Sequence, residues 1–367
     1  MLVALTFQTS AQEDTALLKR AEQLHREMFS IDTHNDAIVK YTHPWRPDAG
    51  ERTQVTFPKM KEGGLDAALF AVFLSQGPRN QNAYDSVMAY TTKEIDFFKS
   101  YVAERSSEAG IAYRSSDFRH LKRQGKSIVM FALENGYGIG TDILNVERLY
   151  NLGVRAITLT HNYNNDVADS SRDTIPEWHG LSPFGYQVVE EMNRLGIIVD
   201  VSHTSTETLY DCLEHSKAPI IASHSCVRAI KDIPRNLTDE EILAIAAKGG
   251  LIQVATGRWC LSDLPREQVD ISVFCDHVDH VRNLVGADHV GIGTDFDGGG
   301  GMVGFEDVSK MKYVTVELLR RGWPEEDIRK FWGENFLRVL REVEKFHDKS
   351  TIDCRNCSFS ISFHFCN

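Results

Sequence analysis

Short apolar runs recur along the whole chain, and most are separated by longer segments in which apolar residues repeat at helical spacing. Several of these runs, such as residues 64–75, are apolar at nearly every position, which is typical of strands buried on both faces of a parallel sheet. The predicted strands are residues 28–36, 64–75, 127–134, 154–161, 197–203, 218–224, 251–256 and 289–295.

The segments between most of these runs predict amphipathic helices. Ser182 is placed as an N-cap with Pro183 at the first helical position, and Gly196 ends the same helix. Thr238 is followed three residues later by Glu241, which is the spacing of a capping box. The predicted helices are residues 15–29, 83–109, 143–152, 183–195, 206–215, 240–248 and 269–285.

Eight strands that alternate with helices predict an α/β fold of the (β/α)8 TIM-barrel type. A doubly wound sheet is the alternative, but no Gly-x-Gly-x-x-Gly loop follows the first strand, and eight units suit a closed barrel better. We assign residues 15–347 to a single barrel domain. Residues 1–14 are interpreted as a signal-peptide remnant or a disordered N-terminus, and residues 348–367 as a tail of unknown order.

Polar residues with metal-binding side chains stand at the ends of most of the predicted strands. In a (β/α)8 barrel the carboxyl ends of all strands surround one site, so residues far apart in the sequence converge there. His34 and Asp36 lie two positions apart, and their side chains can point to the same side of an extended segment. The strand-end residues are His34, Asp36, Glu134, His161, His203, His224 and Asp295.

Imidazole and carboxylate groups without thiolates favour Zn²⁺ or a similar divalent metal. Five candidate ligands are more than one catalytic zinc needs, whereas two ions that share a bridging carboxylate use all of them; these candidates are His34, Asp36, Glu134, His203 and His224. Glu134 is the natural bridge because its carboxylate has two oxygens. Its burial after an apolar strand without a partner would cost several kcal/mol, so a cation is the simplest partner.

Composition narrows the function without defining it. The net charge of −12 argues against nonspecific binding to nucleic acid or to anionic membranes. Residues 1–12 resemble the end of a secretory signal without its basic segment, so we expect export to the periplasm or the extracellular space if this interpretation holds, and a cytoplasmic protein otherwise. Four of the seven cysteines are scattered through the body of the chain, which does not indicate a disulfide framework, although one bridge in an exported protein stays open. The tail motif of Cys354, Cys357 and Cys366 fits no standard zinc pattern closely.

Seven motifs in one order resemble the membrane (renal) dipeptidases, which are zinc metallopeptidases among the amidohydrolase-like metal-dependent barrels. The resemblance covers about residues 29–344 and also includes 180–185 and 306–310. The motifs are Asp32-Thr33-His34-Asn35-Asp36, Leu133-Glu134-Asn135-Gly136, Leu159-Thr160-His161-Asn162, Asp200-Val201-Ser202-His203, Ala222-Ser223-His224-Ser225, Pro234-Arg235-Asn236 and Gly291-Ile292-Gly293-Thr294-Asp295-Phe296-Asp297-Gly298.

The resemblance implies a zinc-dependent dipeptidase that cleaves L,L- and L,D-dipeptides through a metal-bridging hydroxide. It implies one zinc on His34 and Asp36, a second on His203 and His224, and Glu134 as the bridge. It further implies that His161 polarises the scissile carbonyl, that Arg235 binds the carboxylate of the substrate, and that Asp295 shuttles protons. These roles agree with the chemistry of a tetrahedral oxyanion and of a planar carboxylate. A homodimer is also implied.

Two alternatives stay open at this stage. A related amidohydrolase would act on a cyclic amide, a β-lactam or an N-acyl amino acid and would not need Arg235 as a carboxylate clamp. A noncatalytic binding barrel would have lost a ligand, whereas all candidates are present.

The tail after Lys345 has no long apolar segment of the kind that a lipid anchor requires, so we expect no membrane anchor. Loop residues that could shape a substrate pocket are His43, Trp45, Asp166, Asp169, Trp178 and His179.

Overall fold

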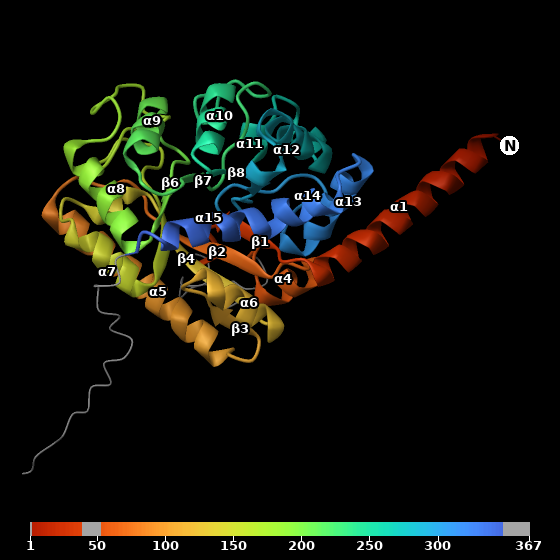
Figure 1. Ribbon diagram of the computed structural model, residues 1–367, viewed down its shortest axis with the longest axis horizontal. Coiled ribbons are helices and arrows are strands. Elements are labelled where there is room, and N and C mark those ends of the chain that lie inside the picture. Colours follow the sequence, from red (N-terminus) through yellow and green to blue (C-terminus); the bar gives the residue numbers. More distant parts are fainter. Residues whose placement is uncertain (1, 39–52, 348–367) are drawn as a thin grey trace, which may run out of the picture.

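The computed structural model describes residues 2–38 and 53–347, with side chains from residue 14 onward. Eight parallel strands follow one another around a nearly closed barrel in the order β1-β2-β4-β5-β6-β7-β8-β9, and a short strand, β3, pairs with β4 outside this ring (Figure 1). The strands are β1 (Ile31–Asn35), β2 (Ala67–Phe73), β3 (Ala109–Ile111), β4 (Ser127–Glu134), β5 (Val154–Thr158), β6 (Ile198–Asp200), β7 (Ile221–Ala222), β8 (Leu251–Val254) and β9 (Val290–Ile292).

Helices surround the barrel and confirm the α/β architecture predicted from the sequence. Short helical turns lie between several of them, and one π-helical turn, η5, joins α14 to α15. The helices are α1 (Leu2–Glu27), α4 (Phe57–Gly63), α5 (Gln81–Glu104), α6 (Ser115–Arg123), α7 (Leu144–Leu152), α8 (Pro183–Leu195), α9 (Thr206–His215), α10 (Asp239–Ala247), α11 (Arg258–Leu261), α12 (Ile271–Val285), α13 (Met311–Arg320), α14 (Glu325–Arg329) and α15 (Asn335–Glu344).

The barrel closes between its first strand and the segment after its last strand. The backbone N–H of Asp295 donates to the carbonyl of His34 at 3.0 Å, and the N–H of Asp36 donates to the carbonyl of Phe296 at 2.9 Å. The carboxylate of Asp32 joins the same seam, because it accepts hydrogen bonds from the backbone N–H and the hydroxyl of Thr294, both at 2.7 Å. The two ends of the strand series are therefore tied together directly beneath the carboxyl-terminal rim.

Several elements are shorter than the apolar runs predict. The fifth and last apolar runs end in His203 and Asp295, which have φ angles of 70° and 59°. A left-handed backbone cannot continue a strand, so β6 and β9 end before these residues. The predicted helix over 83–109 ends at Glu104, because Ala109–Ile111 pairs with β4 instead.

Side chains of β4 alternate between two apolar layers. Ile128 and Met130 belong to an inner cluster with buried residues of α15, such as Phe336 and Leu340, which cover the amino-terminal end of the barrel. Phe131 belongs to the outer cluster and meets Phe98 of α5 edge to face, with ring centroids 6.3 Å apart. The long apolar strand is therefore buried on both faces, as predicted.

Asn335 links α15 to the start of β9. Its side-chain amide donates to the carbonyls of Ala287 and Val290 at 2.7 and 3.0 Å. These contacts anchor α15 to the barrel.

The N-terminal end of α1 extends away from the barrel, whereas Ala21 and Leu24 near its other end are buried (Figure 1). Among the described residues, none of the helices combines the length and the apolar character that crossing a bilayer requires. The interpretation of residues 1–14 as a signal remnant stays a prediction. His43, Trp45 and the cysteines of the tail lie outside the described residues.

Candidate metal centre and active site

The carboxyl ends of the strands open into a cavity of about 370 Å³. Five of the eight residues singled out from the sequence line this cavity, and His34, His224 and Arg235 lie behind its wall. The lining residues are Asp36, Phe73, Glu134, His161, Asn162, Arg172, His203, Trp259, Asp295, Asp297 and Gly298.

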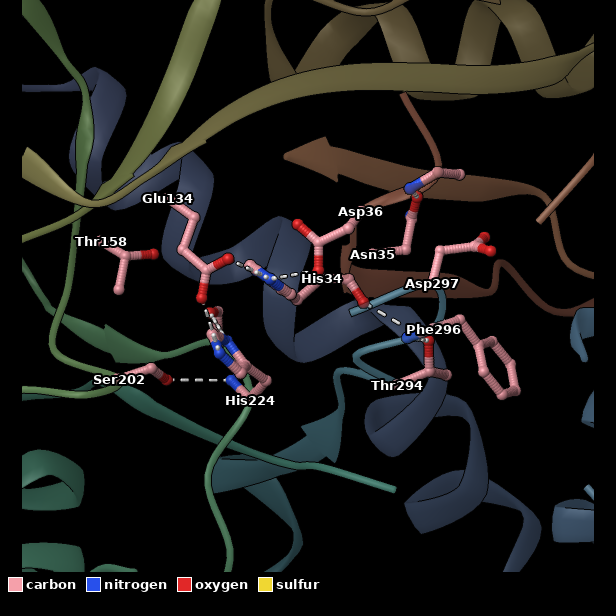
Figure 2. Close-up of polar contacts among 12 residues, drawn as sticks. His34, Asn35, Asp36, Glu134, Thr158, Ser202, His224, Thr294, Phe296 and Asp297 are labelled. Carbon is pink, nitrogen blue, oxygen red and sulfur yellow. Dashed lines mark hydrogen bonds and ion pairs between the residues drawn. The ribbon is translucent and has the colours of Figure 1, made fainter. Parts of the chain in front are cut away.

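Glu134 is the centre of the cluster, and its two carboxylate oxygens face different imidazoles (Figure 2). Oε2 lies 3.5 Å from Nε2 of His34, whereas Oε1 lies 3.3 Å from Nε2 of His203 and 3.4 Å from Nε2 of His224. Asp36 joins on the side of His34, where Oδ2 lies 3.8 Å from Nε2. Residues from four strand ends therefore meet around one buried carboxylate.

Local backbone geometry aims these side chains into the cluster. The pairing of β1 with β2 is irregular between Asp32 and Asn35, which is the segment that carries His34. Such irregularities redirect side chains and are common next to active sites. Asn135 and His203 have positive φ angles of 88° and 70°, an uncommon conformation for residues other than glycine.

A chain of hydrogen bonds orients the ring of His224. Ser223 Oγ donates to Asp200 Oδ2 at 2.5 Å, so its oxygen accepts from Nδ1 of His224, which lies 2.8 Å away. Thr158 Oγ1 also donates to Asp200 Oδ2, at 2.6 Å. With the proton on Nδ1, the lone pair of Nε2 faces Glu134, which is the tautomer that a metal ligand needs.

Burial and crowding shift the pKa values of the cluster strongly. Burial lowers the pKa values of His203 and His224 well below 6.5, which keeps both rings neutral. Burial and the nearby charge of Glu134 raise the pKa of Asp36 well above 3.8. Burial also raises the pKa of Asp295 to about 7, although the charge of His34 partly opposes this shift. The charges of Glu134 and Asp36 raise the pKa of His34 to about 10, although burial opposes this shift. Several buried carboxyl groups therefore crowd one space and disfavour one another's charge.

The donor atoms fit a metal site. Nε2 of His203 and Nε2 of His224 lie 3.0 Å apart and face the same oxygen of Glu134. Within the described chain, the buried atoms His34 Nε2 and Asp36 Oδ1 have no hydrogen-bond partner. Glu134 belongs to two groups of three residues whose ligand atoms all lie within 4.8 Å of one another. One group adds His34 and Asp36, and the other adds His161 and His203. A cation would satisfy these nitrogen and oxygen atoms and offset the crowded charge.

The three residues with implied substrate roles have different surroundings. His161 is partly exposed in the cavity, and its ring lies 4.4 Å from the ring of His203 and 4.8 Å from that of Phe73. Asp295 lines the cavity where the barrel closes between β1 and the segment after β9. Arg235 is buried behind the wall, where it donates to the Ser225 hydroxyl at 2.7 Å and to the His224 carbonyl at 2.6 Å. Its Nε has no hydrogen-bond partner among the described residues.

The segment after β5 lines the cavity through the predicted His161 and through Asn162 and Arg172, to which the sequence assigned no role. Asp166 is held by Arg79 and Tyr84, and Asp169 accepts from backbone N–H groups, including that of Trp178 at 3.0 Å. The loop instead reaches the cavity with His161, Asn162 and Arg172, and Trp259 reaches it from α11. No strand end or regular spacing marks Arg172 or Trp259, although Asn162 stands in a motif quoted above.

Comparisons with known proteins identify the family. The family model for membrane dipeptidase, peptidase family M19, matches residues 18–352. The chain is 34% identical to dipeptidase tcpJ of Claviceps purpurea over 79% of its own length and 69% of the relative. It is 33% identical to dipeptidase verJ of Clonostachys rogersoniana, over 89% of this chain and 87% of the relative.

A solved structure agrees with these matches. The crystal structure of the probable dipeptidase PvdM from Pseudomonas aeruginosa superposes with a TM-score of 0.83 and 31% identity, and covers 90% of this chain and 99% of that one. The barrel, the cluster at its rim and the sequence matches over most of the chain lead to one assignment. The chain belongs to the membrane dipeptidase family, peptidase family M19, and is a metallo-dipeptidase that hydrolyses peptide bonds.

Proposed function

We propose that this enzyme hydrolyses L,L-dipeptides, and dipeptides with a D-residue on the C-terminal side, at a centre of two zinc ions. His34 and Asp36 hold one ion, His203 and His224 hold the other, and Glu134 bridges them. The observation that carries this proposal is the position of Glu134, whose two oxygens face His34 on one side and the His203–His224 pair on the other. That division matches a bridging carboxylate.

The bound ions would supply an activated water and polarise the peptide carbonyl. His161 stands in the cavity with its ring partly exposed and can donate a hydrogen bond to the carbonyl oxygen as negative charge develops there. Burial lowers the pKa of His161, so the ring is a neutral donor at pH 7. Asp295 can accept a proton and return it to the departing amine, because burial brings the pKa of its carboxyl to about 7.

Arg235 is proposed to bind the C-terminal carboxylate of the substrate. Its guanidinium is fixed by Ser225 and His224, which leaves Nε and part of its planar fork without protein partners among the described residues. A planar, permanently charged fork suits a carboxylate. Burying the charged guanidinium of Arg235 without a carboxylate partner costs free energy, and a bound anion would offset that cost.

The test is metal content combined with turnover of a panel of L,L- and L,D-dipeptides, before and after chelation. We expect about two zinc ions per chain, loss of activity on chelation and recovery on addition of zinc. Cleavage of longer peptides without any dipeptide turnover would contradict the proposal. An Arg235→Ala variant with an unchanged KM would favour an amidohydrolase that acts on cyclic or acylated amides.

Two further proposals rest on the sequence and the family resemblance alone. Export would follow if residues 1–12 belong to a signal peptide, and N-terminal sequencing of the mature protein from its source tests this. A homodimer would have about twice the chain mass of 41.4 kDa, and light scattering in solution tests it.

A further inference from the structure

Arg172 is the arginine among the residues that line the cavity, although the proposed function gives it no role. It lies in the loop after β5 and is exposed to solvent. His161 lines the same cavity. A positive charge therefore stands at the cavity wall beside the proposed carbonyl-polarising histidine.

The guanidinium of Arg172 forms no hydrogen bond or ion pair with the residues that the structure describes. The carboxylates of its own loop are engaged elsewhere. Asp166 and Glu177 bind Arg79, with contacts of 2.9 and 2.6 Å, and Asp169 accepts backbone N–H groups. Asp173 accepts from the backbone N–H of Asn164 at 3.2 Å. The loop thus neutralises Arg79 and leaves Arg172 available.

The backbone that carries Arg172 is tied to the active site. The N–H of Ser171 donates to the carbonyl of His203 at 2.8 Å, and the hydroxyl of Ser170 donates to the carbonyl of His161. The N–H of Arg172 itself donates to the Ser170 hydroxyl at 3.3 Å. These hydrogen bonds fix the backbone of Arg172 relative to His161 and His203. A surface arginine on a loosely attached loop would have no such fixed position.

We propose that Arg172 is a specificity residue that selects dipeptides carrying a second anionic group, an Asp or Glu side chain in either residue. This inference rests on the proposed dipeptidase function, in which Arg235 takes the C-terminal carboxylate. The other charged residues among those that line the cavity are the carboxylates of Asp36, Glu134, Asp295 and Asp297, which would repel an anionic side chain. Arg172 is therefore the charged group on the wall that can attract one. An arginine fork binds a planar carboxylate with two hydrogen bonds, and it rejects a cationic side chain by repulsion.

The experiment compares kcat/KM for Ala-Asp, Asp-Ala, Ala-Glu and Glu-Ala with their Asn and Gln isosteres, with Ala-Lys and with Ala-Ala. The zinc-loaded enzyme is measured as the parent and as Arg172→Gln, Arg172→Lys and Arg172→Glu. Arg123→Gln is the matched control, because Arg123 is also an exposed arginine. It ends α6 just before β4 begins, and the start of β4 lies at the end of the barrel away from the active site. Circular dichroism and thermal melting verify that each variant folds.

We expect the parent to prefer at least one acidic dipeptide over its amide isostere by about tenfold in kcat/KM, or about 1.4 kcal/mol. Arg172→Gln should abolish the preference through KM and leave Ala-Ala turnover nearly unchanged. Arg172→Lys should retain part of it, and Arg172→Glu should shift preference toward Ala-Lys. High salt should reduce the preference, because the site is open to solvent.

Equal turnover of acidic and amide dipeptides by the parent would overturn the inference while leaving the dipeptidase function intact. An equal loss on Ala-Ala and on acidic dipeptides in Arg172→Gln would also overturn it, because Arg172 would then bind the carboxylate common to all substrates. Failure to cleave any dipeptide would instead refute the proposed function itself.

Discussion

Ser223 donates a hydrogen bond of 2.5 Å to the carboxylate of Asp200, which lies on the neighbouring strand β6. The same hydroxyl lies 2.8 Å from Nδ1 of His224, so a carboxylate and a serine hold the ring of a proposed zinc ligand. Because the hydroxyl hydrogen points to Asp200, the hydroxyl oxygen fixes the proton of the ring on Nδ1. Nε2 is thereby left free to bind metal.

We predict that Ser223→Ala weakens zinc binding by about 10–100-fold, since loss of such an orienting partner typically has an effect of this size. Competition with a chromophoric chelator measures the zinc affinity, and activity should return at excess zinc. Ser216→Ala is the matched control, because Ser216 is also buried but bonds to Asn193 and to the carbonyl of Ala218 instead. Unchanged zinc affinity in Ser223→Ala would contradict the orienting role.

Glu134→Gln should reduce both zinc content and activity by at least about 100-fold, more than loss of an orienting partner costs. The amide keeps the shape of the side chain but removes the charge that His34, His203 and His224 face. Metal analysis after dialysis and dipeptide turnover measure the effect. Glu94→Gln, a change of a buried carboxyl on α5, should retain zinc and activity. Full zinc retention by Glu134→Gln would refute its proposed bridging role.

Hydrophobic patterning predicted the eight barrel strands because strands buried on both faces have few polar positions. The same pattern hid β3, since Ala109-Gly110-Ile111 is too short and too weakly apolar to stand apart from the helix before it. The ends of strands were predicted too far along, because positive φ at His203 and Asp295 depends on tertiary contacts at the rim.

The proposed ligands were visible in the sequence because each follows an apolar run, and parallel strands bring their carboxyl ends together. Arg172 and Trp259 were not visible, because a loop residue has no periodic neighbours that fix its direction. Their positions follow from contacts that span distant segments, such as the hydrogen bond from Ser171 to His203. Asp166 and Asp169 were named as residues that could shape the pocket, but they stabilise the loop itself.

Trp259 lines the cavity from α11 and is 45% exposed, so part of a large apolar ring is open to a bound substrate. We predict that Trp259→Ala lowers kcat/KM for dipeptides with large apolar side chains by about tenfold, because burying that contact contributes roughly 1–2 kcal/mol. Trp259→Phe should retain most of the activity, and Gly-Gly should be affected little. Tyr210→Ala, at an exposed aromatic on α9, is the control. Equal losses on Gly-Gly and on Leu-Leu would show that Trp259 supports the fold of the loop.

His277 gives the protein a pH-dependent stability, because its ring is buried in the neutral form. Nδ1 accepts from the N–H of Val227 at 3.0 Å, and Nε2 donates to the carbonyl of Leu261 at 2.8 Å. Burial lowers the pKa of His277 from 6.5 to about 4. Between these values the unfolded chain binds a proton that the folded chain does not. The free energy of unfolding therefore falls as the pH falls from 6.5 to 4, by about 1.4 kcal/mol per pH unit.

We predict that the contribution of His277 is fully present above pH 6.5, decreases by roughly 3 kcal/mol in total by pH 4, and changes little below that pH. The measurement is the free energy of unfolding in urea at several pH values for the parent and for His277→Gln. Gln can make both hydrogen bonds but does not titrate, so the difference between the two proteins should narrow or reverse toward pH 4. His120→Gln is the control, because the ring of His120 is exposed on α6. The prediction fails if the parent and His277→Gln differ in free energy of unfolding by the same amount from pH 8 to pH 4. His277 would then have the same pKa in the folded and unfolded chains.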